Sequence, residues 1–355
     1  MKKYRHGHGE EVSRSSMVKV AVVGSGYWGR NHVRTLVALR QEGLIEEVIV
    51  CDLDAQRAEE IGTQFDCSWV TDVDALSEMG VCAATIATPT PSHAALGIRL
   101  MESGIDVMIE KPLAMNHEEA EQVLAVAEST GRLLLVGHVF RHHAGVREAA
   151  RIIAEGRIGP VRQIITERMS SREPRPDNGV IAALGIHDLD ICCDLLGDAE
   201  PQSITGLACE SSIKGIEDHA SLQMQFPDVD GQQGPAAFIT LSWRSRVRGK
   251  VRDLQIIGRD GSIGVDYLDH GGIWLHTHPG DAHGPEFGGF DAAPRERIEI
   301  PLGEPALTAE LRDFVLRSTG QRNTPPLNDG KVGLQGMLRV EQALRATGFE
   351  AQLNQ

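Results

Sequence analysis

The arrangement of apolar segments in the first 140 residues places the strongest constraint on the fold. Six short apolar runs, each of strand length, are separated by stretches whose apolar residues have helical spacing. The runs are MVKVAVV (17–23), EVIVC (47–51), CSWV (67–70), CAATIAT (82–88), IDVMIE (105–110) and LLLVG (133–137). Strands that alternate with helices form a parallel sheet covered on both faces. We therefore predict an α/β, doubly wound N-terminal domain.

A different texture follows residue 140. Strand-like segments separated by Gly, Asp and Pro predict a large, mostly antiparallel open sheet in a C-terminal α+β domain. These segments are VRQIITERM (161–169), ASLQMQF (220–226), AAFITLSW (236–243), VRDLQIIG (251–258), SIGVDYL (262–268) and GIWLHT (272–277). The 355 residues suggest two domains. We divide the chain into a flexible extension (1–16), a cofactor domain (17–138) and a C-terminal substrate-binding and oligomerisation domain (139–355).

Composition excludes several classes of protein. The formal net charge is −15, so a nucleic-acid binder would need a strong local basic patch, and we expect no nucleic-acid partner. No run of eighteen uncharged apolar residues indicates a membrane span, and residues 1–16 lack the apolar stretch of a signal peptide. The six cysteines form no C-x-x-C pair and are typical of reduced core thiols in a cytoplasmic protein. His276, His278 and His283 favour a loop over a metal site, so we expect no metal.

A glycine motif follows the first predicted strand. Gly24-Ser-Gly26-Tyr-Trp-Gly29 matches G-x-G-x-x-G and opens a helical pattern, where bare backbone amides can meet a pyrophosphate. The next strand ends at Asp52, whose carboxylate can accept hydrogen bonds from an adenosine ribose and would repel a 2′-phosphate. The order of strand, glycine turn, helix and acid predicts NAD as cofactor, in preference to NADP.

Two further segments stand at the ends of predicted parallel strands, where such sheets bind ligands. They are Ile86-Ala-Thr-Pro-Thr-Pro-Ser-His93 and Glu110-Lys111-Pro112. Lys111 is the only lysine between Lys19 and Lys214, and its position suits a proton donor or an oxyanion stabiliser. A surface lysine after a buried strand is the alternative interpretation. His93 caps or lines its loop rather than doing chemistry.

These segments, in this order, resemble the Gfo/Idh/MocA oxidoreductases. The resemblance continues through GHVFRHHAGV, HDLDICCDLLG and LSWRSRVRGKVRDLQIIGRDGSIGVDYL, and so covers residues 17–348. It implies a Rossmann domain that binds NAD, a C-terminal domain whose open sheet supports a homodimer or homotetramer, and hydride transfer at a sugar hydroxyl. The stretch GVIAALGIHDLDI most resembles the nucleotide-sugar branch, especially the UDP-N-acetylglucosamine 3-dehydrogenases.

The resemblance also assigns roles to residues. It places Lys111 and His187 in the active site as the catalytic pair, with a bond to Pro112 that is often cis. Expected substrate contacts are Lys111, His187 and Arg141, with a surface ion pair as the alternative for Arg141. Arg172, in the loop before His187, is a further expected substrate contact. Expected cofactor contacts are Gly24, Gly26, Tyr27, Trp28, Gly29, Asp52, Thr88, Pro89, His93, Glu110 and Lys111.

Three positions depart from the family pattern. The family usually has an Asp four residues before the catalytic histidine, and this chain has Ala183. His143 and Ala144 stand where nucleotide-sugar enzymes often have Asn-Pro. Two alternatives stay open, and the missing acid bears on the second of them. One is an inositol or free-sugar dehydrogenase, and the other is a catalytically silent NAD-binding regulator.

A cationic run lies between two predicted strands. Arginine or lysine occupies every second position from Arg244 to Arg252, and these side chains would share one face if the segment were extended. Such a stripe suits a substrate pyrophosphate, the acids of a partner subunit, or a solvated face. Arg172 and Arg175, in the loop before His187, are alternative phosphate contacts.

Overall fold

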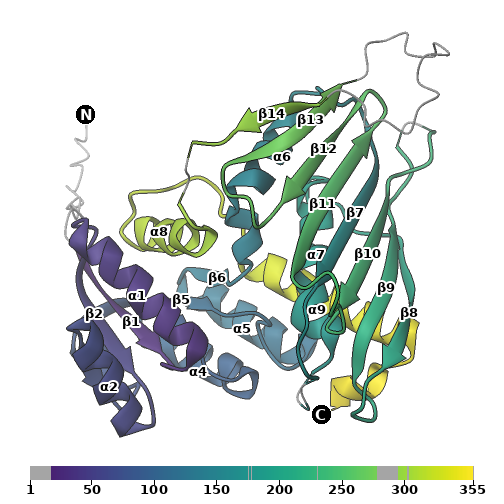
Figure 1. The fold of residues 1–355 in the computed structure, drawn as a ribbon. Coiled ribbons are helices and arrows are strands. Elements are labelled where there is room, and N and C mark those ends of the chain that lie inside the picture. Colours follow the sequence, from purple (N-terminus) through teal and green to yellow (C-terminus); the bar gives the residue numbers. More distant parts are fainter. Residues whose placement is uncertain are drawn as a thin grey trace, which may run out of the picture.

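The computed structural model describes residues 17–354 apart from 175, 177, 230, 278–294, 302 and 303. The predicted 1–16 extension, Arg175, His278 and His283 therefore lie outside the described residues. Two sheets dominate the described chain, one of six strands and one of eight, with helices between and around them (Figure 1).

The N-terminal sheet has the order β3-β2-β1-β4-β5-β6, and every neighbouring pair is parallel. The strands are β1 (Val18–Val23), β2 (Ile45–Cys51), β3 (Ser68–Val70), β4 (Val81–Ile86), β5 (Asp106–Ile109) and β6 (Leu134–Val136). The helices are α1 (Tyr27–Gln41), α2 (Ala55–Phe65), α3 (Ala75–Glu78), α4 (His93–Glu102) and α5 (His117–Thr130). All six predicted strands are confirmed, and the strand order is that of a dinucleotide-binding Rossmann domain.

The C-terminal sheet has the order β14-β13-β12-β11-β7-β10-β9-β8, and all its pairs are antiparallel except β7 with β10. The strands are β7 (Val161–Met169), β8 (Ser203–Glu210), β9 (Glu217–Gln225), β10 (Ala236–Ser242), β11 (Val251–Gly258), β12 (Gly261–Asp266), β13 (Gly272–Thr277) and β14 (Glu296–Glu299). Strands β8 and β14 were not predicted from the sequence. The helices of this part are α6 (Ala144–Ala154), α7 (Ile186–Asp194), α8 (Ala306–Ser318) and α9 (Gly330–Thr347).

Packing crosses the domain boundary predicted after residue 138. Helix α8 lies beside α1 in Figure 1, and its Leu311 and Phe314 belong to the same buried cluster as Val20 and Leu36. Helix α9 places Met337 against the parallel sheet and Val340 against the core of the antiparallel sheet. The last 50 residues therefore contribute apolar side chains to both cores.

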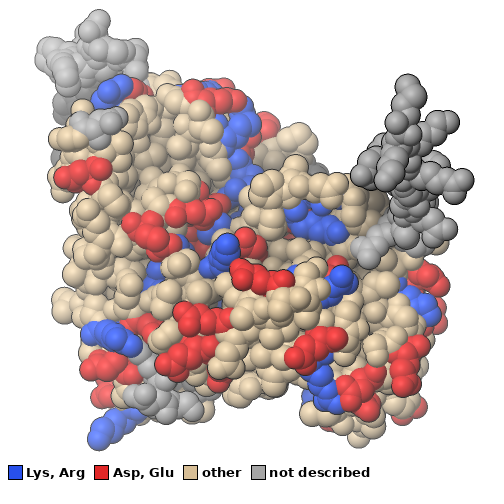
Figure 2. Space-filling view, turned by 180° about the vertical axis from the view of Figure 1, so that it is seen from behind, with Lys and Arg blue, Asp and Glu red and all other residues tan. Residues whose placement is uncertain are grey.

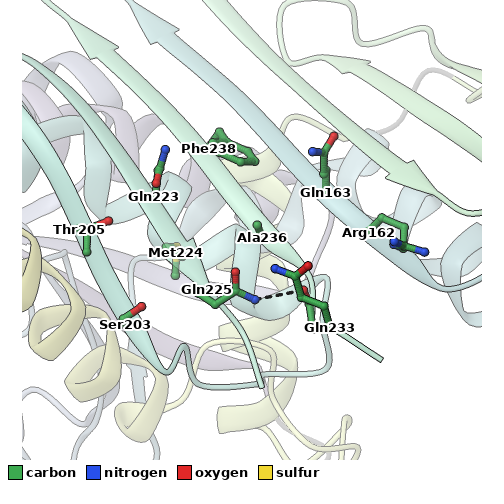
Figure 3. A pocket seen from close by; sticks show the side chains of 11 residues that line it. Arg162, Gln163, Ser203, Thr205, Gln223, Met224, Gln225, Gln233, Ala236 and Phe238 are labelled. Atoms are coloured by element: carbon green, nitrogen blue, oxygen red, sulfur yellow. Dashed lines mark hydrogen bonds between the residues drawn. The ribbon is translucent and has the colours of Figure 1, made fainter. Parts of the chain in front are cut away.

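The two faces of the eight-stranded sheet differ. Helices α6, α7 and α9 cover the inner face, where Ile239 and Leu241 are buried (Figure 1). The outer face carries a shallow hollow of about 590 Å³, lined mainly by polar side chains of β7, β8, β9 and β10 (Figure 3). Phe238 lies in this hollow, and Leu207 on the same face is 81% exposed. No helix of the described chain covers this outer face.

The surface carries charges of both signs, and the cysteines are free thiols. Lys and Arg side chains are scattered among Asp and Glu on the face shown in Figure 2. Within the described ranges, no helix has the length and apolar character needed to cross a bilayer, and no group of His, Cys, Asp and Glu has a metal-binding arrangement. All six cysteines are unpaired. The prediction that they lie in the core is wrong for Cys82 and Cys209, which are exposed.

Candidate active site

The glycine loop between β1 and α1 has the geometry of a pyrophosphate cradle. Gly24 has a φ of +87°, and a Cβ there would lie 2.7 Å from Thr88 Cγ2. A Cβ on Gly29 would lie 1.7 Å from the Gly24 carbonyl oxygen. Gly26 has nothing within 4 Å of such a Cβ, so the backbone is open where the loop meets the N-terminus of α1. This arrangement fits the phosphates of a dinucleotide.

Asp52, at the end of β2, holds this loop in place. Its Oδ2 accepts hydrogen bonds from the backbone N–H and the hydroxyl of Ser25, both at 2.8 Å, and Oδ1 accepts one from Asp54 N at 3.0 Å. Arg57 Nη1 lies 3.4 Å from Oδ1. Burial acts to raise the pKa of this carboxyl, but the hydrogen bonds from Ser25 and Asp54 outweigh it and the pKa is lowered. Asp52 is therefore a carboxylate at neutral pH.

Other predicted cofactor contacts surround the loop. Tyr27 and Trp28 begin α1 and are 83% and 47% exposed, with their rings edge to face at 5.9 Å. After β4, Ser92 donates a hydrogen bond to Thr88 Oγ1 at 2.7 Å, and its backbone N–H donates to Pro89 O at 3.0 Å. The loop after β4 thus lies against Gly24, as the sequence predicts for strand ends of one parallel sheet.

His93 joins two of these strand ends. Its Nδ1 lies 2.8 Å from Pro112 O and its Nε2 lies 2.9 Å from Thr88 O, while the side chain is almost completely buried. This geometry agrees with a loop-lining role, and it positions the segment after β5 against the segment after β4. A direct contact of His93 with cofactor stays a prediction.

Glu110 is fixed in the segment after β5. It accepts a hydrogen bond from Lys111 N at 3.2 Å and lies 3.1 Å from His32 Nε2 of α1. Burial acts to raise its pKa, but His32 and Lys111 outweigh that effect and the pKa is lowered. The Lys111–Pro112 peptide bond is cis, as the family resemblance implies.

Lys111 reaches from the N-terminal domain to the residues before α7. Its Nζ donates a hydrogen bond to the carbonyl oxygen of Ala183 at 3.2 Å. Ala183 belongs to a π-helical turn, Ile181–Gly185, that leads directly into α7. Such turns are frequent at functional sites. Glu217 of β9 anchors this turn by accepting a hydrogen bond from Ile181 N at 2.8 Å.

His187 lies in the first turn of α7 and is only 9% exposed. Its Nδ1 is buried without a hydrogen-bond partner among the described residues. Burial first, and then the positive charges of Lys111 and Arg168, place the pKa of His187 well below its usual value. The imidazole is therefore neutral near pH 7 and can accept a proton. The structure thus brings Lys111 and His187 to one place, as predicted.

A buried layer that the sequence analysis missed lies beneath His187. The ring of Phe140 meets His187 edge to face at 4.9 Å, and the guanidinium of Arg168 lies 4.3 Å from the Phe140 ring centroid. Arg168 donates two hydrogen bonds to Asp188, at 2.5 and 3.1 Å. Tyr267 packs against the same Phe140 ring. Ile164, Thr166 and Arg168 are buried at every second position of β7, so a strand period counted from Ile164 would have placed Arg168 on the inner face.

Of the two interpretations of Arg141, the structure favours the ion pair, which is buried and not at the surface. Arg141 is 1% exposed and donates two hydrogen bonds to Asp190, at 2.7 and 2.9 Å. It also donates to Leu327 O at 2.8 Å and to Asp198 at 2.7 Å. A guanidinium so fully used holds α7 against the helical turn after β6. His138 lies 3.3 Å from the same Asp190 carboxylate.

The cationic run does not form the predicted stripe. Strand β10 ends at Ser242 and β11 begins at Val251, so the residues between them turn instead of extending. Arg244 lies 3.5 Å from Asp218, and Arg248 donates to Glu167 at 2.8 Å. Arg172 stacks on Trp243, with 4.9 Å from the guanidinium carbon to the ring. Its contact with substrate stays a prediction.

The departures at His143 and Ala144 lie at the start of α6. His143 is buried against Tyr267 and His270, and burial with the His270 charge lowers its pKa to about 4. Neither residue replaces the acid missing at Ala183. Asp188 and Asp190 do not replace it either, because each is bound to a buried arginine.

These features are those of an NAD-binding oxidoreductase. The Rossmann sheet provides an open glycine cradle and a strand-end carboxylate, and a lysine lies beside a neutral histidine. Residues 18–138 match the oxidoreductase family described as having an NAD-binding Rossmann fold, and residues 146–264 match the Gfo/Idh/MocA C-terminal domain. The chain belongs to the Gfo/Idh/MocA oxidoreductase family.

Several relatives of known activity are similar over most of their length. UDP-N-acetylglucosamine 3-dehydrogenase of Acidithiobacillus ferrooxidans is 29% identical over 93% of this chain and 98% of its own. Its solved structure has a TM-score of 0.78 and covers 95% of this chain and 99% of that one. A 2,7-anhydro-N-acetylneuraminate hydratase of Mediterraneibacter gnavus is 30% identical over 72% of this chain and 69% of its own. An inositol 2-dehydrogenase of Rhizobium meliloti is 28% identical over 86% and 98%.

We predict that NAD binds at least ten-fold more tightly than NADP, a difference of about 1.4 kcal/mol. The Asp52 carboxylate would repel a 2′-phosphate, whereas Asp52→Asn keeps an acceptor for Ser25 and leaves Arg57 free to attract that phosphate. Calorimetric titration of both proteins with both cofactors measures the effect. Asp52→Asn should reduce the ratio of the NAD affinity to the NADP affinity. Equal affinities in the unmodified protein would show that Asp52 does not face the ribose.

Proposed function

We propose that this protein is an NAD-dependent dehydrogenase that oxidises a ring hydroxyl of a nucleotide-linked sugar, with UDP-N-acetylglucosamine as the first candidate. One observation carries this proposal. Lys111 reaches the turn before α7 and acts electrostatically on His187, in the same protein that has the glycine cradle. The similarity to a UDP-N-acetylglucosamine dehydrogenase over 93% of this chain supports the substrate class.

The geometry supports a division of labour between two side chains. NAD, when bound along Gly24–Gly29 and Asp52, supplies the hydride acceptor. Neutral His187 accepts the proton of the substrate hydroxyl. The Lys111 ammonium stabilises the negative charge that develops on that oxygen. Phe140 and the core behind it keep water away from one side of the imidazole.

Ala183 changes how this pair is oriented. The side chain offers no acid, but the Ala183 carbonyl accepts the hydrogen bond from Lys111. The backbone therefore positions the ammonium where a carboxylate would otherwise do so. A carbonyl brings no negative charge, so it does not raise the basicity of His187. This is the specific observation that favours the second candidate, a silent NAD-binding regulator.

Two expectations about the protein's setting belong to the same proposal. Six unpaired cysteines support a reducing, cytoplasmic compartment. The outer face of the eight-stranded sheet, uncovered by helices and carrying Phe238 and Leu207, supports a homodimer or homotetramer.

A screen of UDP-sugars, inositols and free sugars for NADH production tests the function. We expect turnover with a UDP-sugar, and a loss of about 10²- to 10⁴-fold in kcat for Lys111→Ala and for His187→Ala, since acid–base groups typically contribute that much. NAD affinity should stay nearly unchanged in both variants. Wild-type turnover by Lys111→Ala would show that the active site is assigned wrongly.

Ala183→Asp is the matched control for the silent alternative. A carboxylate at this position would raise the basicity of His187 through its charge, so we expect the variant to keep activity or to gain it, with an altered pH–rate profile. If the unmodified protein oxidises no compound in the screen while Ala183→Asp does, the regulator replaces the dehydrogenase as the better account.

Light scattering tests the assembly. We expect a dimer or tetramer mass at micromolar concentration, and we expect Phe238→Arg to shift it toward the monomer because it places a charge on the outer sheet face. Leu53→Arg, an exposed position in the other domain, should leave the mass unchanged. A mass of 38.6 kDa for the unmodified protein would contradict the proposed assembly.

A further inference from the structure

One member of the cationic run faces the inside of the molecule. Arg252, the second residue of β11, pairs directly with Arg168 of β7 in the antiparallel ladder. Directly paired residues lie on the same face of a sheet, and Arg168 is on the inner face, where it is 2% exposed. Two guanidinium groups are therefore neighbours beneath α7. Like charges in such a pair are destabilising unless something compensates them.

A carboxylate binds only one of these two arginines directly. Asp188 binds Arg168 through both carboxylate oxygens. Arg252 donates hydrogen bonds to two backbone carbonyls, those of Met169 at 2.5 Å and Val251 at 2.7 Å. Within the part of the chain that the structure describes, no carboxylate lies within 4.0 Å of its guanidinium. Burial, and then the charge of Arg168, lower the pKa of Arg252 to about 10, although the charge of Asp188 offsets part of this effect.

This cation lies close enough to His187 to act on it electrostatically. The positive charge of Arg252 is one of those that lower the pKa of His187. Its neighbour Arg168 stacks on Phe140, which itself contacts the His187 ring. The Arg252 carbonyl also accepts a hydrogen bond from Tyr267 N, whose ring packs on Phe140. Arg252 is therefore connected to the His187 region through its backbone bond to Tyr267 and its position opposite Arg168.

We propose that Arg252 binds an oxyanion of the substrate, a phosphate or a carboxylate, close to the hydroxyl that is oxidised. The inference rests on the proposed function, because it takes the His187 region as the substrate site. Guanidinium recognises both groups through paired, charge-assisted hydrogen bonds. Arg252 adds to the surroundings of His187 a positive charge that no carboxylate of the described residues binds directly, and a neutral polyol cannot offset that charge. The site therefore favours phosphorylated or carboxylated sugars over inositols.

Calorimetry on the NAD-bound protein tests this without turnover. The probes are UDP, inorganic pyrophosphate and N-acetylneuraminate, which separate the phosphate source from the carboxylate source. We expect at least one of them to bind, and Arg252→Gln to weaken that binding at least ten-fold. Arg252→Lys keeps the charge and should have an intermediate effect. Arg246→Gln, an exposed control from the same run, should change affinity less than two-fold.

The outcomes distinguish the inference from the proposed function. Unchanged binding in Arg252→Gln, equal loss in Arg246→Gln, or no binding of any probe overturns the inference. Loss confined to N-acetylneuraminate identifies a carboxylate, and loss with UDP and pyrophosphate identifies a phosphate. Binding through Arg252 with no UDP-sugar oxidised overturns only the proposed substrate. NAD affinity and Tm show whether each variant is folded. If Arg252→Gln does not fold, Arg252→Lys is used in its place.

Discussion

The hydrogen bond from Lys111 to the Ala183 carbonyl joins the two domains at the reaction site. Its geometry depends on supports on both sides. On the N-terminal side, His93 and Glu110 fix the strand end that carries Lys111. On the C-terminal side, Glu217 holds the π-helical turn that presents Ala183. Loss of the hydrogen bonds on either side would be expected to move Lys111 relative to His187 and to impair the proposed reaction.

Buried ion pairs hold α7, and therefore His187, in place. Arg141 binds Asp190, and Arg168 binds Asp188, with all four side chains at most 2% exposed. Removing one partner of such a pair typically costs about 3–5 kcal/mol, because the other charge is left buried. The same pairs use up the acids near His187. Burial first, and then the nearby cations, keep the imidazole neutral, and Arg252 is left for an anionic substrate group.

Local patterns predict the first domain well because its chemistry is continuous in sequence. The strand, the glycine loop and the following helix are neighbours along the chain, and the strand-end Asp52 and Lys111 follow from parallel topology. Arg141 could not be interpreted this way, since its partners Asp190 and Asp198 come from a different helix region. A buried ion pair and a substrate arginine look alike until both partners are placed. The prediction remained open between a substrate contact and an ion pair.

The second domain shows the other limit. Cations at every second residue share a face only in an extended segment, and the segment between β10 and β11 turns instead. Arg252 differs from Arg244 and Arg248 because it lies within β11, in register opposite Arg168. Pairing register is a long-range property, because it is set by the contacts of whole strands. The pairing of β8 with β9 and the packing of α8 on the Rossmann domain also depend on contacts between segments that are distant in the sequence.

The proposed chemistry requires His187 to be a neutral base that is buried near cations, with no acid hydrogen-bonded to its Nδ1 among the described residues. Nuclear magnetic resonance titration of ¹⁵N-labelled histidines in the NAD-bound protein, assigned with His187→Gln, measures its pKa directly. Because the folded-state pKa is lowered, His187 should stay neutral as the pH falls from 8 to its unperturbed value of about 6.5, and should become protonated only below that value. A pKa at or above about 6.5 would contradict the account, because it would require a negative partner that the site around Ala183 does not provide.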